Sequence, residues 1–239
     1  MARRTAEASL SDDVGLAHDI RDVSISPIGL AGTLRVPKNA YALVTFVHGS
    51  GSSRFSPRNM AVASALNTYG IVTLLFDLLT PAEEVDRANV FDIPLLADRL
   101  VDAVRWLDRE HLVGTLPLGL FGASTGAAAA LVAAAKLPDR VGAVVSRGGR
   151  PDLAGVALDM VRAPTMLIVG GADFGVIELN EQALARLRGP KVLEIVPGAS
   201  HLFPEPGALE AVIGHAARWF ERYLAPTPTA RGGEGRRPA

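Results

Sequence analysis

The stretch LGLFGASTGAAAALVAAA, from Leu118 to Ala135, decides the fold of this chain. Its apolar start predicts a buried strand, its alanine-rich end predicts a helix, and Gly122 and Gly126 allow a tight turn between them. Such a turn holds Ser124 at its apex, with the hydroxyl above the sheet and the helix N-terminus beneath it. A serine there suits a nucleophile, but it also suits a simple helix cap. Because the pentapeptide is short enough to arise by chance, the rest of the chain must decide.

The composition indicates one large α/β domain without obvious affinity for polyanions. The chain has 239 residues, 49% of them hydrophobic and 5% aromatic, with a net charge of −1 and no cysteine. These values indicate no nucleic acid or anionic membrane as a partner, and they exclude disulfides and a cysteine nucleophile. We find neither a signal peptide pattern nor an apolar run long enough to cross a membrane. We therefore expect a cytoplasmic protein whose partner is a small molecule, while its oligomeric state stays open.

Apolar segments alternate with helical patterns along the chain, which predicts a mostly parallel sheet covered by helices on both faces. The strands look too apolar for a solvent-facing side. A hairpin at the sheet edge is expected over 23–36, and the acidic segment 77–86 is expected as a loop. The remaining strands are expected at 41–47, 71–76, 118–121, 141–145, 165–169 and 192–196, with helices opening near Pro57, Asp92, Pro151, Leu179 and Pro206.

Three chain segments follow from this pattern. Residues 1–17 are expected to be a flexible leader, 18–225 the folded domain, and 226–239 a disordered tail because of its composition. The connection between the strands at 141–145 and 165–169 has only about twenty residues, which leaves no room for a large cap domain.

A serine nucleophile needs a base, an orienting carboxylate and donors for the oxyanion. Asp173 follows the strand 165–169, and His201 follows the strand 192–196. Both therefore fall at the carboxyl ends of strands, where open α/β sheets bind their ligands. The order Ser124, Asp173, His201 is that of the α/β hydrolases, so the sequence predicts a catalytic triad of these residues.

Other carboxylates and histidines fit this chemistry less well. Asp152 is the main alternative for the acid, but its place at the opening of a helix favours an N-cap role. His18, His111 and His215 are interpreted as exposed and silent, and His111 and His215 lie at or within expected helices, away from the carboxyl end of any strand.

Backbone N–H groups are expected to form the oxyanion hole. One is that of Thr125, directly after the nucleophile, and the second is that of Ser50, in the loop after the strand 41–47. His48 is expected to shape that loop through hydrogen bonds and to border the substrate.

The same loop offers a weak alternative as a dinucleotide site. Gly49 and Gly51 follow a strand and precede a helix, but the third glycine position is Arg54. Asp77 also lies farther along the chain than the about 20 residues that a ribose contact requires. We therefore expect no cofactor, and no metal-binding motif is present either.

Three arginines are expected near the serine, at the same edge of the sheet: Arg54, Arg147 and Arg150. They suit binding of a carboxylate or phosphate on the substrate. Pairing with Asp77, Glu83 or Asp152 to fix the loops is an equally good interpretation.

Several segments together resemble the dienelactone-hydrolase-like branch of the α/β hydrolases. They are HGSGSSRFSPRN, LLFDLLTPAEE, GASTG, SRGGRPDLA, LIVGGAD and PGASHLF, and the resemblance covers about Ile20 to Leu224. It is strongest to a small subgroup without a cap domain that is sometimes fused to a phosphoribosyltransferase domain, for which we find no segment in this sequence. The resemblance implies Ser124, Asp173 and His201 as nucleophile, acid and base. True dienelactone hydrolases use a cysteine nucleophile, and this chain has no cysteine. The family name therefore does not give the substrate.

The sequence thus predicts an α/β-hydrolase fold and a serine hydrolase that acts on a small ester, lactone or thioester. Two alternatives stay open. One is a hydrolase-fold protein that binds a small ligand or partner without turnover, and the other is an acyltransferase that uses the same site.

Overall fold

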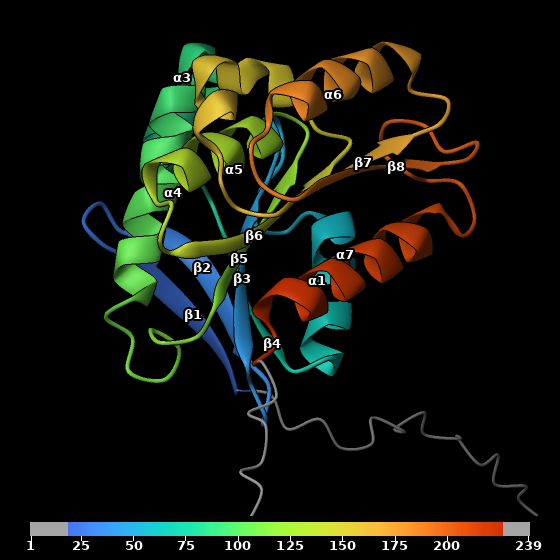
Figure 1. Cartoon of the computed structure of the whole chain (residues 1–239). Helices are drawn as coiled ribbons and strands as arrows, with labels where there is room; N and C mark the ends of the chain where they lie inside the picture. The colour runs from blue at the N-terminus through green and yellow to red at the C-terminus, as the bar shows by residue number, and fades with distance from the viewer. Residues whose placement is uncertain (1–18, 227–239) are drawn as a thin grey trace, which may run out of the picture.

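The computed structural model describes residues 19–226 as a single twisted sheet between two layers of helices (Figure 1). The expected leader, and the tail from residue 227 onward, lie outside the described residues. The eight strands are β1 (Asp19–Ile25), β2 (Leu30–Val36), β3 (Ala42–Val47), β4 (Ile71–Phe76), β5 (Leu118–Ala123), β6 (Val141–Arg147), β7 (Thr165–Gly170) and β8 (Lys191–Val196).

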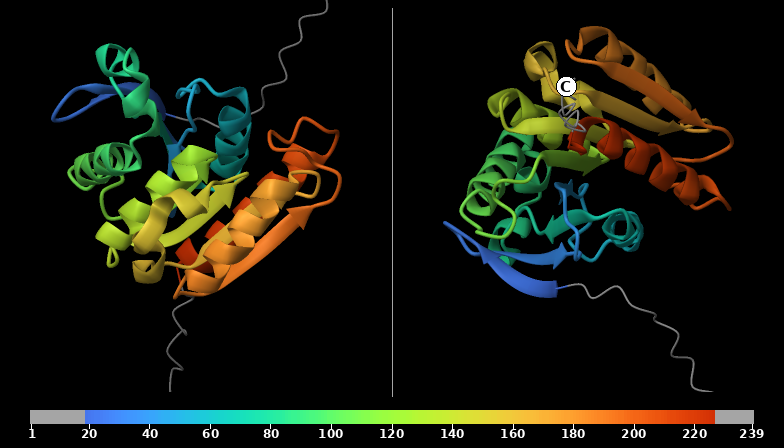
Figure 2. Two further views of the ribbon diagram at one scale, coloured as in Figure 1. Left: turned by 90° about the horizontal axis from the view of Figure 1, so that it is seen from above. Right: turned by 60° about the horizontal axis from the view of Figure 1, so that its bottom comes forward.

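The strand order is β1-β2-β4-β3-β5-β6-β7-β8. β1 and β2 form the expected antiparallel hairpin at one edge, β2 pairs antiparallel with β4, and all further pairs are parallel. Figure 2 shows how far the sheet twists between the edge at β1 and the edge at β8. The parallel strands bring their carboxyl ends to one side of the molecule, which is where the candidate site lies.

Helices cover both faces of the sheet and make two separate cores. On one face pack α4 (Ile93–Leu107), α5 (Thr125–Lys136), the 3-10 helix η1 (Pro151–Met160) and α6 (Phe174–Arg186); on the other pack α1 (Pro57–Thr68) and α7 (Ala208–Leu224). The α5 alanines have small side chains, so this helix is buried almost all round between the sheet, α4 and η1. The predicted fold class is therefore confirmed.

Two details differ from the sequence-based expectations. The segment 77–86 is not a plain loop, because it contains the short helix α2 (Pro81–Glu84) and leads into α3 (Arg87–Phe91). Thr80 and Glu83 start α2 with a reciprocal capping box. In addition, the side chains of β8 are mostly half-exposed, because this strand forms the sheet edge and has a neighbour on one side only.

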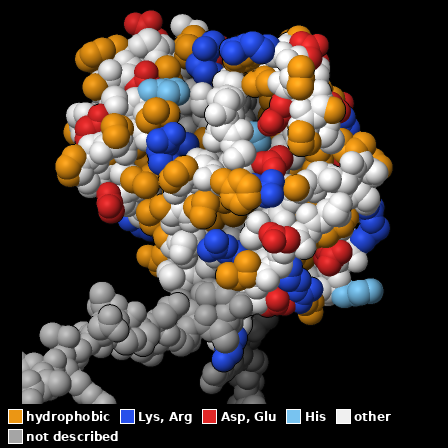
Figure 3. Space-filling view, turned by 180° about the vertical axis from the view of Figure 1, so that it is seen from behind, with side chains coloured by type: hydrophobic (Ala, Val, Ile, Leu, Met, Phe, Trp, Pro, Cys, Tyr) orange, Lys and Arg blue, Asp and Glu red, His pale blue; other side chains and the backbone are white. Residues whose placement is uncertain are grey.

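Charged side chains are interspersed on the face seen in Figure 3. Lysines and arginines alternate there with acidic and apolar groups. Within residues 19–226, no helix is both long and apolar enough to cross a membrane.

Candidate active site

Ser124 lies at the turn between β5 and α5 with φ 53° and ψ −125°, a backbone conformation that residues other than glycine rarely adopt. The turn needs both glycines of the motif. A Cβ on Gly122 would lie 2.5 Å from the Cα of Ala127, and one on Gly126 would lie 2.3 Å from the carbonyl oxygen of Val47. The Ser124 side chain makes no hydrogen bond that caps α5, so the interpretation of Ser124 as a helix cap is wrong. Backbone strain of this kind is concentrated at functional sites.

Asp173 and His201 are in direct contact. The Nδ1 of His201 lies 2.7 Å from the Oδ2 of Asp173, and the Asp173 side chain is 16% exposed. Asp173 occupies the N-cap position of α6 but does not cap it with its side chain, which leaves the carboxylate free for the imidazole. Because a carboxylate only accepts, Nδ1 donates this bond, and Nε2 is left as the proton acceptor.

Ser124 and His201 approach each other around Gly148, just after β6. The N–H of Ser124 donates to the carbonyl oxygen of Arg147 at 3.2 Å. On the other side, a Cβ on Gly148 would lie 2.8 Å from the carbonyl oxygen of His201 and 3.7 Å from its Cε1. Within residues 19–226 no hydrogen bond joins the Ser124 hydroxyl to the imidazole; such bonds are often long before substrate binds. The three triad candidates thus lie on the same side of the molecule, at the carboxyl ends of the parallel strands.

The loop after β3 lies directly over the start of α5. The N–H of Ser50 donates to the Thr125 hydroxyl at 2.8 Å, so one of the two expected oxyanion donors has an internal acceptor. Thr125 is the first residue of α5, and its N–H therefore has no acceptor within the helix. Gly49 completes this contact, since a Cβ there would lie 2.9 Å from the Cβ of Ser124. The sequence analysis did not identify this need for glycine at position 49, although a His-Gly pair after a buried strand is a usable signal.

His48 connects the loops that follow β3 and β4. Its Nδ1 lies 3.0 Å from the carbonyl oxygen of Gly49, and its Nε2 accepts the N–H of Leu78 at 3.3 Å. This pattern requires a neutral ring protonated at Nδ1. Burial lowers the pKa of His48, because it disfavours the charged form. The expected role of His48 in shaping the loop agrees with these contacts.

The arginines expected near the serine have different surroundings. Arg54 forms an ion pair with Asp77, and Arg150 makes two bonds of 2.8 Å to the carboxylate of Asp152. These two arginines therefore fix loops, in agreement with the second interpretation. Arg147 is only 5% exposed and takes part in no ion pair within residues 19–226.

Three further expectations concern single side chains. Glu83 pairs with Arg99 on α4 rather than with an arginine near the serine. Asp152 does not cap η1, because Arg150 holds the N-cap position and binds the Asp152 side chain, so the predicted N-cap role is wrong. His111 is exposed as expected, and His18 lies outside the described residues. His215, on α7, is half-buried rather than exposed, and its Nδ1 lies 3.9 Å from a Glu194 oxygen.

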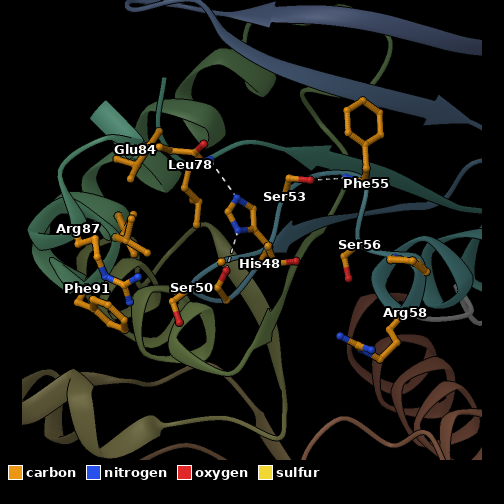
Figure 4. Close-up of a pocket in the computed structure, with 17 residues that line it drawn as sticks. His48, Ser50, Ser53, Phe55, Ser56, Arg58, Leu78, Glu84, Arg87 and Phe91 are labelled. Carbon is orange, nitrogen blue, oxygen red and sulfur yellow. Dashed lines mark hydrogen bonds between the residues drawn. The ribbon is translucent and has the colours of Figure 1, made fainter. Parts of the chain in front are cut away.

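A cavity of about 720 Å³ lies on the far side of the β3–α1 loop, and none of the three triad candidates lines it. Gly49 and Ser50 form its boundary with the nucleophile, and α2 and α3 form its far wall. Figure 4 shows Arg58 extending into it from α1 and Arg87 from the opposite side. Apolar wall residues, among them Leu79, Val90 and Phe91, give it a mixed character. Arg58, Arg87 and this wall were missed, because a sequence does not show which loops face one another.

Side chains that commonly bind metal ions do not gather in the described part of the chain. Residues 19–226 contain no group of three histidine or acidic side chains that are placed to hold a metal ion. The groups that do meet at the carboxyl ends of the strands are a hydroxyl, an imidazole and a carboxylate.

Comparisons with known proteins give strong similarity over most of the chain. A dienelactone hydrolase from Anabaena variabilis has 54% sequence identity and a TM-score of 0.84, over 87% of this chain and 99% of that protein. Est1E from Butyrivibrio proteoclasticus has 16% identity and a TM-score of 0.70, over 85% of this chain and 98% of that one. The dienelactone hydrolase-like phosphotriesterase P91 from metagenomic libraries has 16% identity and a TM-score of 0.72, over 88% and 100%. The last two show the fold alone.

A longer relative comes from Mycobacterium tuberculosis. A protein with the name "Putative phosphoribosyl transferase" is 55% identical over 225 residues, which are 93% of this chain. The chain spans only 51% of the length of that relative, so the name describes a protein about twice as long. No family model matches the chain. The similarity to the Anabaena protein, which this chain covers almost completely, shows that the chain belongs to the dienelactone hydrolase-like α/β hydrolases.

Proposed function

We propose that the protein is a serine hydrolase that cleaves a small ester, lactone or thioester through an acyl-enzyme. The observation that carries this proposal is the 2.7 Å contact between His201 and Asp173, at the same sheet edge as a serine held at φ 53°. A strained serine on its own is compatible with a purely structural turn, and a His–Asp pair on its own with a structural ion pair. Their convergence after three different strands matches what nucleophilic acyl transfer requires.

In the acylation step, Nε2 of His201 takes the proton of the Ser124 hydroxyl while Oγ attacks the carbonyl carbon of the substrate. The carbonyl π bond opens, and its electron pair goes to the oxygen. When the tetrahedral intermediate collapses, the bond to the leaving alkoxide or thiolate breaks, and His201 returns the proton to that group. Asp173 keeps Nδ1 protonated and stabilises the imidazolium between these transfers.

The negative oxygen of the intermediate would lie at the N-terminus of α5, where the Thr125 N–H has no acceptor within the helix. The Ser50 N–H is the second donor in this proposal. Because it binds the Thr125 hydroxyl at 2.8 Å, it must turn from that hydroxyl toward the oxyanion or divide its bond between the two. The Thr125 hydroxyl would then hold the loop in place until the substrate arrives.

Deacylation repeats these steps with water as the nucleophile. His201 removes a proton from water, the hydroxide adds to the acyl carbon, and Ser124 leaves with the proton. No cofactor or metal takes part in the proposed reaction. The short β6–β7 connection and the cavity of about 720 Å³ suit a small acyl group. The name of the similar Anabaena protein, a dienelactone hydrolase, agrees with this reaction class.

A panel of p-nitrophenyl esters with acyl chains of increasing length tests the proposal. We expect the wild type to hydrolyse the short members, with a loss of roughly a millionfold in kcat for Ser124→Ala. A folded wild type without activity on any ester or thioester would contradict the proposal and favour a protein that only binds its ligand. Release of p-nitrophenol that depends on an added alcohol or thiol acceptor would favour acyl transfer.

A further inference from the structure

Arg147 is a buried positive charge without a counter-ion in the described part of the chain. Its side chain is packed between α1 and the ring of Phe203, whose centre lies 5.9 Å from the guanidinium carbon. A long hydrogen bond of 3.4 Å to the Asn59 side chain is its one side-chain bond within residues 19–226, and its buried Nε has no partner there. Burial of a charge is costly unless an opposite charge compensates it. The surroundings of Arg147 thus lack a negative charge that would compensate its guanidinium group.

A second arginine increases this imbalance. Arg58, on the first turn of α1, lies close enough for its charge to lower the pKa of Arg147, which burial and Arg58 together bring to about 10. The Arg147 guanidinium is therefore still charged at neutral pH. The Nε of Arg58 is also buried and without a partner among residues 19–226.

Three other partly buried arginines near this end of the sheet have a carboxylate partner. Arg54 pairs with Asp77, Arg99 with Glu83, and Arg150 with Asp152. Neither Arg58 nor Arg147 takes part in any ion pair within residues 19–226. Two like charges that come from separate elements, at the end of β6 and the start of α1, suit a ligand that brings the missing negative charge.

The arginine pair lies next to the proposed reaction centre. The carbonyl oxygen of Arg147 accepts the N–H of Ser124 at 3.2 Å. Arg58 lines the cavity of about 720 Å³, as Gly49 and Ser50 do, and Figure 4 shows its side chain among the lining residues. Arg147 lies behind that wall and binds Asn59, the residue after Arg58. The N-terminus of α1, a helix of 12 residues, adds a favourable dipole for an anion.

We propose that Arg58 and Arg147 bind the phosphate group of a phosphorylated ester or lactone whose carbonyl carbon reaches Ser124. This inference rests on the proposed function and names its substrate class. A phosphate monoester carries a charge of about −1.5 to −2 at pH 7 and three acceptor oxygens, which matches two arginine forks. A carboxylate carries a single charge and would leave one arginine uncompensated.

Binding can be measured without any turnover. Isothermal titration with inorganic phosphate and phenyl phosphate, in a phosphate-free buffer of constant ionic strength, compares the wild type with Arg147→Met and Arg58→Gln. We expect each substitution to weaken binding by about tenfold or more, as the loss of a charge-assisted bond does. Arg87→Gln is the matched control, because it removes a charge from the opposite wall of the same cavity. We expect Arg87→Gln to change the affinity for phosphate by less than about twofold, because salt screens a charge on the far wall of the cavity.

Three outcomes would overturn the phosphate subsite. The first is no binding of either phosphate by the folded wild type, and the second is an equal loss with Arg87→Gln. The third is acetate or benzoate binding as tightly as phenyl phosphate, which would assign the pair to a carboxylate. A purely structural role for Arg147 predicts that Arg147→Met lowers Tm and still binds phosphate. The subsite predicts instead that phosphate raises the Tm of the wild type and not that of Arg147→Met.

A second pair of measurements separates this inference from the proposed function. Ser124→Ala should bind phosphate as the wild type does, even though it cannot turn over. With active enzyme, the ratio of kcat/KM for p-nitrophenyl esters with and without a terminal phosphate on the acyl chain should fall about tenfold in Arg58→Gln. Phosphate binding without ester hydrolysis would keep the subsite and reject the hydrolase. Ester hydrolysis by a protein that does not bind phosphate would keep the hydrolase and reject the subsite.

Discussion

The Nδ1 of His201 lies 2.7 Å from a carboxylate oxygen of Asp173, although the two residues come from loops after different strands. Parallel pairing of β7 with β8 brings those loops together. The contact fixes the tautomer that leaves Nε2 free to accept a proton, which is the form a general base needs.

Substitution of Asp173 by Asn should remove this control of the tautomer while keeping the shape of the side chain. We expect kcat for a short p-nitrophenyl ester to fall by about 10,000-fold, with an unchanged far-UV circular dichroism spectrum. The control is Asp152→Asn, which breaks the pair with Arg150 and leaves the His201 contact intact. A larger loss for Asp152→Asn would show that the acid was assigned to the wrong residue.

Relief of strain at Ser124 should make the protein more stable. A φ of 53° costs a residue with a Cβ about 1–3 kcal/mol, which exceeds the about 0.5–1 kcal/mol that the freedom of glycine costs. We therefore expect Ser124→Gly to unfold in urea with a free energy about 1 kcal/mol above that of Ser124→Ala, in spite of the greater freedom of glycine in the unfolded chain. Equal stability of the two variants would argue against strain at the turn.

The close approach of α5 to β3 predicts a strong effect at Gly126. A Cβ there would lie 2.3 Å from the carbonyl oxygen of Val47, so Gly126→Ala should destabilise the fold by about 1–3 kcal/mol and disturb Ser124. Gly175→Ala, on α6, has nothing within 4 Å of the added Cβ and should stabilise by about 0.5–1 kcal/mol. Urea unfolding of both variants checks the prediction, and a stable, active Gly126→Ala enzyme would refute it.

The neutral state of His48 predicts a dependence of stability on pH. Burial lowers its pKa below the ordinary value of 6.5, so the unfolded chain takes up a proton before the folded one does. The stabilisation is complete above pH 6.5 and is lost as the pH falls through the folded-state pKa. We expect the unfolding free energy of the wild type to fall more steeply between pH 7 and pH 5 than that of His48→Gln, which cannot take up this proton. Parallel curves would contradict the assignment.

The sequence was sufficient for the sheet, because continuous apolar runs, glycines and prolines mark the strands and turns locally. The capping box at Thr80 and Glu83 was also a usable signal for α2, but the acidic character of the segment suggested a loop. The position of β8 at the sheet edge, with half-exposed side chains, depends on strand order and not on composition.

The candidate site was predictable where single residues follow strands, as Ser124, Asp173 and His201 do. Arginines were harder, since Arg54, Arg147 and Arg150 look alike in sequence, and only Arg147 is buried without a carboxylate among the described residues. Arg58 was not singled out, because its closeness to Arg147 depends on a contact between distant segments, in which Arg147 binds Asn59 on α1.

Covalent labelling with a fluorophosphonate probe, read by intact mass and peptide mapping, shows directly whether Ser124 is an activated nucleophile. We expect one adduct per chain, on Ser124, which is absent in Ser124→Ala and forms much more slowly in His201→Ala because the serine then lacks its base. A folded wild type that stays unlabelled, or a label on another residue that persists in Ser124→Ala, would contradict this role of Ser124.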